Sequence, residues 1–166
     1  VSDALPLAQA LVEGGLNVLE VTLRTEAALA AVEEIAKHLP DAHVGTGTVL
    51  NASDIQRSVD AGATFMVSPG ATEALLDAAD NVSVPLLPGA ANPSEVMRLL
   101  ERGYGYQKFF PAEAAGGIPM LKSIGGPLGK VKFCPTGGVS PQNAKDYLSL
   151  SNVVCVGGSW MAAPKL

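Results

Sequence analysis

The chain has 166 residues, of which 48% are hydrophobic and 16% charged, and its formal net charge is −5. This length fits one domain with its own core, and the composition excludes a disordered or fibrous chain. The acidic balance argues against a nucleic-acid partner, because a surface that contacts phosphates needs a surplus of Lys and Arg.

Helices and strands are predicted to alternate along the whole chain. Apolar periodicity and helix-ending Gly and Pro residues indicate, in chain order, helix 5–12, strand 17–23, helix 25–39, strand 42–49, helix 53–61, strand 64–67, helix 72–79, strand 84–87, helix 93–101, strand 106–110, helix 118–124, strand 131–134, helix 141–150 and strand 153–156. Strict alternation predicts parallel βα units in one α/β domain. Short turns rich in Gly and Pro follow the strands, which favours a (β/α) barrel over an open, doubly wound sheet.

The cysteines and the apolar runs predict where the protein is found. Cys134 and Cys155 lie in apolar runs, which predicts buried thiols in a reducing compartment and therefore a cytoplasmic protein. No apolar run reaches the ~18 residues of a membrane span, and the first residues lack the pattern of a signal peptide, so no membrane partner is expected. No Gly-x-Gly-x-x-Gly motif joins a strand to a helix, so no dinucleotide cofactor is predicted.

A carboxylate lies within the predicted strand 17–23. The side chains alternate from Leu19 to Thr25, so that Glu20, Thr22 and Arg24 share one face, and the apolar residues Leu19, Val21 and Leu23 lie on the other. An ordinary half-solvated strand gives the same pattern. In a parallel sheet both faces are covered, so a carboxylate there is buried, and burial is costly unless the group is paired or neutralised. We therefore expect Glu20 to be buried and functional.

A lysine occupies the middle of the predicted strand 106–110. A lysine in such a position can blunt an edge strand or extend its amine to water. A closed barrel has no edge, however, and an amine beside Tyr106 and Phe110 is desolvated. Desolvation disfavours the ammonium form and leaves a nucleophile suited to Schiff-base chemistry. We interpret Lys108 as that nucleophile.

Glycine-rich turns follow the last two predicted strands, at Gly137-Gly138 and Gly157-Gly158-Ser159. Barrels frequently bind phosphate with the backbone N–H groups of these two loops, and small residues let an anion approach closely. The sequence therefore predicts a phosphate site there. The two histidines, His38 and His43, have no Cys or carboxylate at ligand spacing, so no metal site is predicted.

Seven motifs occur in the order found in a known enzyme family. They are LEVTLRTE at 19–26, VGTGTVL at 44–50, VSPG at 67–70, PLLPG at 85–89, KFFPAE at 108–113, FCPTGG at 133–138 and CVGGSW at 155–160. The chain thereby resembles the 2-keto-3-deoxy-6-phosphogluconate / 4-hydroxy-2-oxoglutarate aldolases from Leu5 to Met161, and the first and fifth motifs are the specific ones. The resemblance implies a class I aldolase on a TIM (β/α)₈-type barrel that needs no cofactor or metal and forms a homotrimer. Compared with that fold the sequence lacks the first strand and the last helix, so we expect one barrel domain over 1–166, truncated at both ends.

The resemblance also implies roles for particular residues. Lys108 matches the imine-forming lysine and Glu20 the proton-shuttling carboxylate. Arg24 and Thr48 match residues that bind the pyruvate carboxylate, and Thr136 matches a position on the aldehyde side that affects stereochemistry. The remaining matches are the phosphate-binding Gly137, Gly138, Gly158 and Ser159, and the pocket-lining Pro69 and Phe110.

The expected reaction is cleavage of 2-keto-3-deoxy-6-phosphogluconate, a small-molecule 2-keto acid phosphate, to pyruvate and glyceraldehyde 3-phosphate. Cleavage of 4-hydroxy-2-oxoglutarate to pyruvate and glyoxylate, or of 2-keto-3-deoxy-6-phosphogalactonate, fits the same residues. A sugar-phosphate epimerase or isomerase would instead use Glu20 as a base without an imine. A third alternative is an inactive truncated barrel that only binds a phosphorylated acid.

Overall fold

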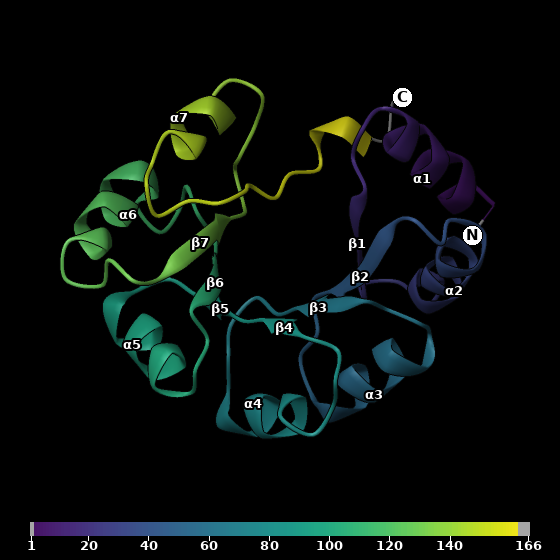
Figure 1. Ribbon diagram of the computed structural model, residues 1–166, viewed down its shortest axis with the longest axis horizontal. Coiled ribbons are helices and arrows are strands. Elements are labelled where there is room, and N and C mark those ends of the chain that lie inside the picture. The colour runs from purple at the N-terminus through teal and green to yellow at the C-terminus, as the bar shows by residue number, and fades with distance from the viewer. Residues whose placement is uncertain (1, 163–166) are drawn as a thin grey trace. The chain divides into compact units, whose positions relative to one another are not determined.

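The computed structural model describes residues 2–162, in which parallel strands alternate with helices (Figure 1). The elements are α1 (Ala4–Glu13), β1 (Val18–Thr22), α2 (Ala28–His38), β2 (His43–Gly47), α3 (Ala52–Asp60), β3 (Phe65–Val67), α4 (Glu73–Ala79), β4 (Leu86–Leu87), β5 (Gly89–Ala90), α5 (Pro93–Glu101), β6 (Tyr106–Phe109), α6 (Gly117–Gly125), β7 (Lys132–Pro135), α7 (Ala144–Leu148) and the 3₁₀ helix η1 (Trp160–Ala162). One sheet has the order β1-β2-β3-β4 and the other the order β5-β6-β7. The prediction of parallel βα units is confirmed.

Several helices begin where a polar side chain caps the first turn. Asn51, Thr72 and Asn92 precede α3, α4 and α5, and each side chain accepts a hydrogen bond from a backbone N–H three residues later. Such caps satisfy N–H groups that have no partner within the helix. Pro93 at the first position of α5 needs no N–H partner, which suits it to a helix start. These local signals explain why α4 and α5 lie close to their predicted positions.

The described residues fall into two compact units, which are treated separately below. The first comprises residues 2–68 and 72–86. Its core lies where α1 and α2 pack on the sheet, and it includes Leu19 of β1, Val44 of β2, and Val32 and Ile35 of α2. Because successive side chains of a strand point to opposite faces, Glu20 points away from the face on which Leu19 packs against the helices.

The second unit comprises residues 69–71 and 87–162. Its central strand, β6, pairs with β5 on one side and β7 on the other. Gln107 of β6 faces α5, since its Nε2 donates hydrogen bonds to Val96 O at 3.2 Å and Tyr104 O at 2.9 Å. Phe109 lies on the same face and packs edge-on against Phe133 of β7. Lys108, between them in the strand, therefore points to the opposite face.

Two predicted strands are wrong in detail. The predicted strand 84–87 is shorter in the structure, where β4 covers only Leu86–Leu87. A second short strand that was not predicted, β5, follows Pro88, which has no N–H to donate; β4 belongs to the first sheet and β5 to the second. The predicted strand 153–156 is not a strand, and this segment forms only the isolated bridges Phe133↔Val153 and Thr136↔Gly157. The bridged residues of this segment, Val153 and Gly157, are four positions apart, whereas their partners, Phe133 and Thr136, are three positions apart. One extra residue in this segment therefore interrupts the ladder.

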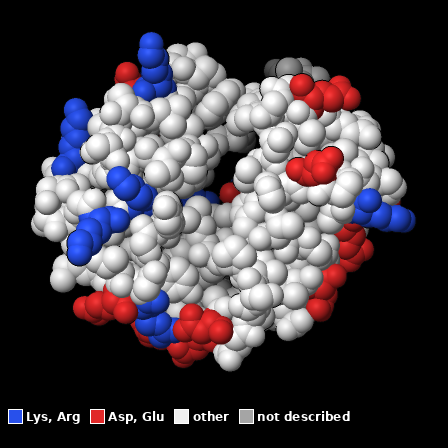
Figure 2. Space-filling view, in the orientation of Figure 1, with Lys and Arg blue, Asp and Glu red and all other residues white. Residues whose placement is uncertain are grey.

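On the face shown in Figure 2, most of the surface is uncharged, and the basic side chains stand apart from one another, most of them over the part that carries α5 to α7. This distribution offers no continuous basic footprint for nucleic acid on that face. Within residues 2–162, no helix is long and apolar enough to cross a membrane.

Candidate active site

Lys108 is the buried amine of the second unit. Its side chain is only 6% exposed, and its Nζ lies 5.0 Å from the centre of the Phe110 ring. Its strand has a partner on both sides, which excludes the interpretation of an edge-strand lysine. The register pairs Lys108 with Gly89 on β5 and with Cys134 on β7, so space is left on one side by the missing side chain of Gly89. The predicted burial of this lysine is confirmed.

Pro69 contributes its main chain beside Lys108. A Cβ atom at position 89 would collide with the carbonyl group of Pro69, so the residue opposite Lys108 has to be glycine. The Pro69 segment, Phe110 and Lys108 therefore gather around β5 and β6 in this unit, as the sequence motifs predict. Tyr106, which was predicted to desolvate the amine, is 63% exposed at the start of β6, so Phe110 is the aromatic neighbour that matters.

The turn after β7 presents free backbone N–H groups. Gly137 and Gly138 both have left-handed backbone conformations, with φ of 97° and 82°. The carbonyl oxygen of Thr136 accepts a hydrogen bond from Ala112 N at 2.8 Å, and that of Gly137 accepts one from Glu113 N at 3.1 Å. Among the described residues, no acceptor receives the N–H of Gly137 or Gly138. A turn with engaged carbonyls and free N–H groups is suited to bind an anion.

The second glycine turn lies next to the first. The bridge between Thr136 and Gly157 joins the two, and Gly157 N donates to Pro135 O at 2.9 Å. Gly158 and Ser159 are exposed, and their N–H groups also find no acceptor in the described part of the chain. The ring of Trp160 occupies the place that a side chain at position 158 would need, which requires glycine there. Thr136, between the two turns, is half-buried.

The cysteines differ from the prediction of two buried thiols. Cys155 is exposed and Cys134 is half-buried, because the extra residue that interrupts the ladder brings Cys155 out of the packed strand. The hydrogen bond from Cys134 lowers the pKa of Cys155 to about 7 despite the opposing effect of burial. The same hydrogen bond, burial and the charge of Cys155 together raise the pKa of Cys134.

A carboxylate and a tyrosine near the first glycine turn were not predicted as site residues. Tyr147 of α7 is fully buried and donates a hydrogen bond through its Oη to Glu113 Oε1. The pKa of Tyr147 is raised, mainly by burial and to a smaller extent by the hydrogen bond to Glu113. Helical spacing identifies Tyr147 only as a core residue, and Glu113 is indistinguishable from a solvated loop carboxylate until the two are seen together.

The first unit carries three more predicted site residues: Glu20 in the middle of β1, Arg24 after β1 and Thr48 directly after β2. Glu20 is exposed, so the prediction of a buried carboxylate is wrong. The physical reason is that β1 is an edge strand whose register partner is Gly45, and the Glu20 side chain lies across Gly47, so two glycines leave it uncovered. Arg24 is exposed, and its Nε donates to Thr22 Oγ1 at 3.1 Å.

Thr48 follows β2 directly and has a strained backbone. Its φ is 60°, a left-handed conformation that costs a residue with a branched Cβ about 1–2 kcal/mol. Such strain is concentrated at functional sites. The half-buried Thr48 therefore has the backbone signature of a site residue, which the sequence pattern does not reveal.

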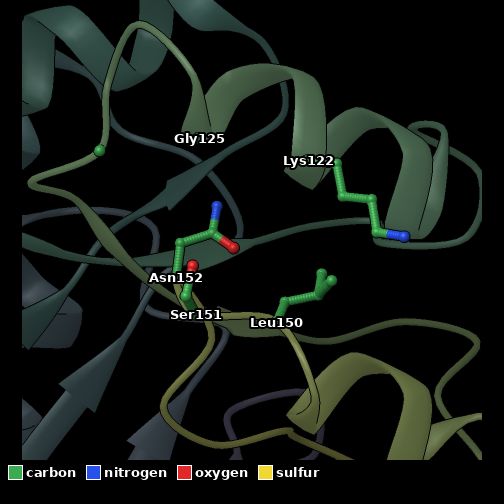
Figure 3. Close-up of a pocket in the computed structure, with 6 residues that line it drawn as sticks. Lys122, Gly125, Leu150, Ser151 and Asn152 are labelled. Carbon is green, nitrogen blue, oxygen red and sulfur yellow. The ribbon is translucent and has the colours of Figure 1, made fainter.

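A separate pocket in the second unit is lined by none of the predicted site residues (Figure 3). Its volume is about 180 Å³, and it is lined by Lys122, Gly125, Gly129, Leu150, Ser151 and Asn152. Asn152 Nδ2 donates to Leu121 O at 2.9 Å, and a Cβ at position 125 would lie 2.9 Å from that nitrogen. These contacts join α6 to the segment after α7, so the pocket marks a packing junction. No group of three or more His, Cys, Asp or Glu that could hold a metal ion occurs among residues 2–162.

Comparison with known proteins gives a consistent result. The family model described as KDPG and KHG aldolase matches residues 1–166. The 2-dehydro-3-deoxy-phosphogluconate aldolase of Pseudoalteromonas atlantica is 54% identical over 98% of this chain and 75% of its own length. The KHG/KDPG aldolase of Escherichia coli is 54% identical over 95% of this chain and 74% of its own.

A solved structure shows the same fold. The KDPG aldolase of Legionella pneumophila, with pyruvate captured at low pH as a covalent carbinolamine intermediate, superposes with a TM-score of 0.97 at 52% identity, over 99% of this chain and 80% of that one. This similarity confirms the predicted fold class, α/β of the TIM-barrel type. The chain spans about three quarters of the length of the curated relatives.

Proposed function

The chain belongs to the KDPG and KHG aldolase family, and we propose how its residues cleave 2-keto-3-deoxy-6-phosphogluconate (KDPG) to pyruvate and glyceraldehyde 3-phosphate. The enzyme is a carbon–carbon lyase. The observation that carries the mechanism is the burial of Lys108 in the central strand of its sheet, beside the Phe110 ring and opposite a glycine.

The proposed reaction begins at Lys108. Its Nζ attacks the C2 ketone of KDPG, and loss of water from the carbinolamine gives a protonated imine. The imine withdraws the electron pair of the C3–C4 bond when the C4 hydroxyl loses its proton, so the bond breaks and glyceraldehyde 3-phosphate leaves. The remaining enamine takes up a proton at C3, and hydrolysis of the resulting imine releases pyruvate and the free amine. Glu20 is proposed to shuttle these protons, a task to which its exposed carboxylate has solvent access.

Binding of the pyruvate half is assigned to Arg24 and Thr48. A guanidinium is planar and can bind a carboxylate through two parallel hydrogen bonds. The hydrogen bond from Arg24 Nε to Thr22 leaves the other guanidinium nitrogens for a ligand. Thr48 carries its hydroxyl at a strained backbone position directly after β2, and strain of this kind is concentrated at functional sites.

Binding of the phosphate half is assigned to the two glycine turns. The free N–H groups of Gly137, Gly138, Gly158 and Ser159 are donors without acceptors among the described residues, which supports this role. Thr136 joins these turns to β7 and is proposed to contact the aldehyde carbon chain, while Pro69 and Phe110 line the pocket. 4-Hydroxy-2-oxoglutarate, which lacks a phosphate, is proposed as a second substrate that yields pyruvate and glyoxylate.

We also propose that the enzyme is a homotrimer in the cytoplasm. The family resemblance supports the trimer. Light scattering combined with size-exclusion chromatography tests it, and a mass of one or two chains would contradict it.

Substrate competition and a lysine substitution test the proposal together. We expect a higher kcat/KM for KDPG than for 2-keto-3-deoxy-6-phosphogalactonate or 4-hydroxy-2-oxoglutarate. Lys108→Arg should lower kcat/KM by about 10³-fold or more, because a guanidinium cannot form the imine. Lys132→Arg is the matched control, since the Nζ of this β7 lysine donates to Ser151 O at 2.8 Å and the residue has no proposed role in the reaction. Cleavage of KDPG by Lys108→Arg within about tenfold of wild type would contradict the proposal, because it would show that no imine at Lys108 is needed.

A further inference from the structure

The glycine turn after β7 is held by two side chains that have no role in the reaction described above. Glu113 lies in the loop after β6, and Tyr147 lies on α7. We propose that Glu113 and Tyr147 are positioning residues that hold the Gly137-Gly138 turn ready for the phosphate of the substrate. This inference rests on the proposed function of that turn.

Glu113 is fitted closely against the turn. Its N–H donates to Gly137 O at 3.1 Å, and the neighbouring Ala112 N–H donates to Thr136 O at 2.8 Å. A Cβ atom at position 138 would lie 2.5 Å from Cγ and 2.7 Å from Cβ of Glu113. The stem of Glu113 thus occupies the space beside Gly138 that any larger residue would fill.

Helix α7 holds the other side of the turn. Asn143, directly before α7, donates from Nδ2 to Gly138 O at 3.1 Å. The carbonyl oxygens of Thr136, Gly137 and Gly138 are therefore all engaged, whereas the N–H groups of Gly137 and Gly138 have no acceptor among the described residues. This asymmetry leaves the turn with donors only, which is the requirement for binding a phosphate.

The hydrogen bond from Tyr147 has a second consequence. A carboxylate beside a phosphate site repels the ligand, and a carboxylate that is free to turn can accept the N–H groups itself. Tyr147 Oη donates to Glu113 Oε1 from a fully buried position, which directs the carboxylate toward α7. Removal of this hydroxyl frees Glu113 to compete with the substrate phosphate for the turn.

The test uses Tyr147→Phe, which removes the hydroxyl and keeps the ring. We expect KM for KDPG to rise about tenfold, the value of one hydrogen bond to a charged group, with kcat within about twofold. The inhibition constant of inorganic phosphate should rise in parallel, and KM for 4-hydroxy-2-oxoglutarate should not change. Tyr106→Phe is the matched control, because this exposed tyrosine pairs in register with Lys132 at the start of β7, whereas the turn follows the other end of β7, and because it has no proposed role.

Two further variants separate positioning from general stabilisation. Glu113→Gln retains an acceptor for Tyr147 and should keep KM for KDPG close to wild type, and Tyr147→Phe combined with Glu113→Gln should recover part of the lost affinity because the competing charge is gone. A uniform loss of activity on both substrates, or an unchanged KM for KDPG, overturns the inference. If wild type itself fails to form a borohydride-reducible adduct with pyruvate, or shows no competition by phosphate, the proposed function has failed instead.

Discussion

Alanine substitution at Gly138 tests how tightly the phosphate turn is packed, and Gly103→Ala provides a matched reference. Both glycines have left-handed backbones, with φ of 82° and 89°. A Cβ at position 103 would meet nothing within 4 Å, whereas one at position 138 would lie 2.5 Å from Glu113 Cγ. The pair therefore separates backbone strain from side-chain collision.

The expected magnitudes follow from these contacts. At either position a left-handed alanine costs about 1–2 kcal/mol, offset in part by the lower entropy of its unfolded chain, so Gly103→Ala should cost about 1 kcal/mol. At position 138 the collision involves the stem of Glu113, which cannot move without disturbing its hydrogen bond with Tyr147. Loss of a hydrogen bond to a charged group adds about 1.5–3 kcal/mol, so Gly138→Ala should cost about 3 kcal/mol.

Equilibrium urea unfolding measures both free energies, and thermal unfolding checks them. A chain of this size loses about 2–4 °C in Tm per kcal/mol, so Gly138→Ala should unfold about 6–12 °C below wild type and Gly103→Ala about 2–4 °C below. Equal losses for the two variants would refute the reasoning, because they would show that Glu113 does not restrict position 138.

Two predictions concern other parts of the structure. The pKa of Cys155 is lowered to about 7, so about half of its thiol is ionised at that pH. Iodoacetamide should therefore alkylate Cys155 about tenfold faster than an ordinary cysteine, and faster than Cys134, whose pKa is raised. Peptide mass spectrometry measures both rates, and preferential alkylation of Cys134 would contradict the prediction. In the first unit, the buried Thr46 Oγ1 donates to Ser58 Oγ at 2.7 Å. Ser58→Ala should lower the free energy of unfolding by about 1–3 kcal/mol because it leaves the Thr46 hydroxyl without a partner, whereas Thr46→Val should lower it by about 1 kcal/mol or less. Urea unfolding measures both losses, and a larger loss for Thr46→Val would contradict the prediction.

The burial of Lys108 could be predicted from the sequence because it follows from the alternation of side chains along one strand. The alternation of Gln107, Lys108 and Phe109 assigns the lysine to one face of a strand, and the structure confirms that Gln107 faces α5 while Lys108 is buried on the opposite face. Local patterns of this kind depend only on strand geometry. They do not depend on which residues lie across the sheet.

The predictions that fail depend on neighbours in space. Glu20 was expected to be buried, but its exposure is set by Gly45 and Gly47 on the adjacent strand. The apolar run 153–156 was expected to be a strand, but the one-residue offset against β7 breaks the ladder and exposes Cys155. Register and its interruptions arise from tertiary pairing, which single-strand periodicity does not encode.

The pairing of Glu113 with Tyr147 has the same origin. The two residues are 34 positions apart and belong to different elements. Each has an ordinary interpretation in its own segment, and only the packing of α7 against the loop after β6 joins them. The residues that position a site are therefore harder to predict from sequence than the residues that lie in recognisable motifs.

Borohydride reduction in the presence of pyruvate tests the central claim that Lys108 forms the imine. The account predicts one irreversible pyruvate adduct per chain in the intact mass, located on Lys108 by peptide mapping and missing in Lys108→Arg. Activity should be lost in proportion to the adduct. An adduct on a different lysine, or an unmodified Lys108 in an enzyme that still cleaves KDPG, would contradict the account.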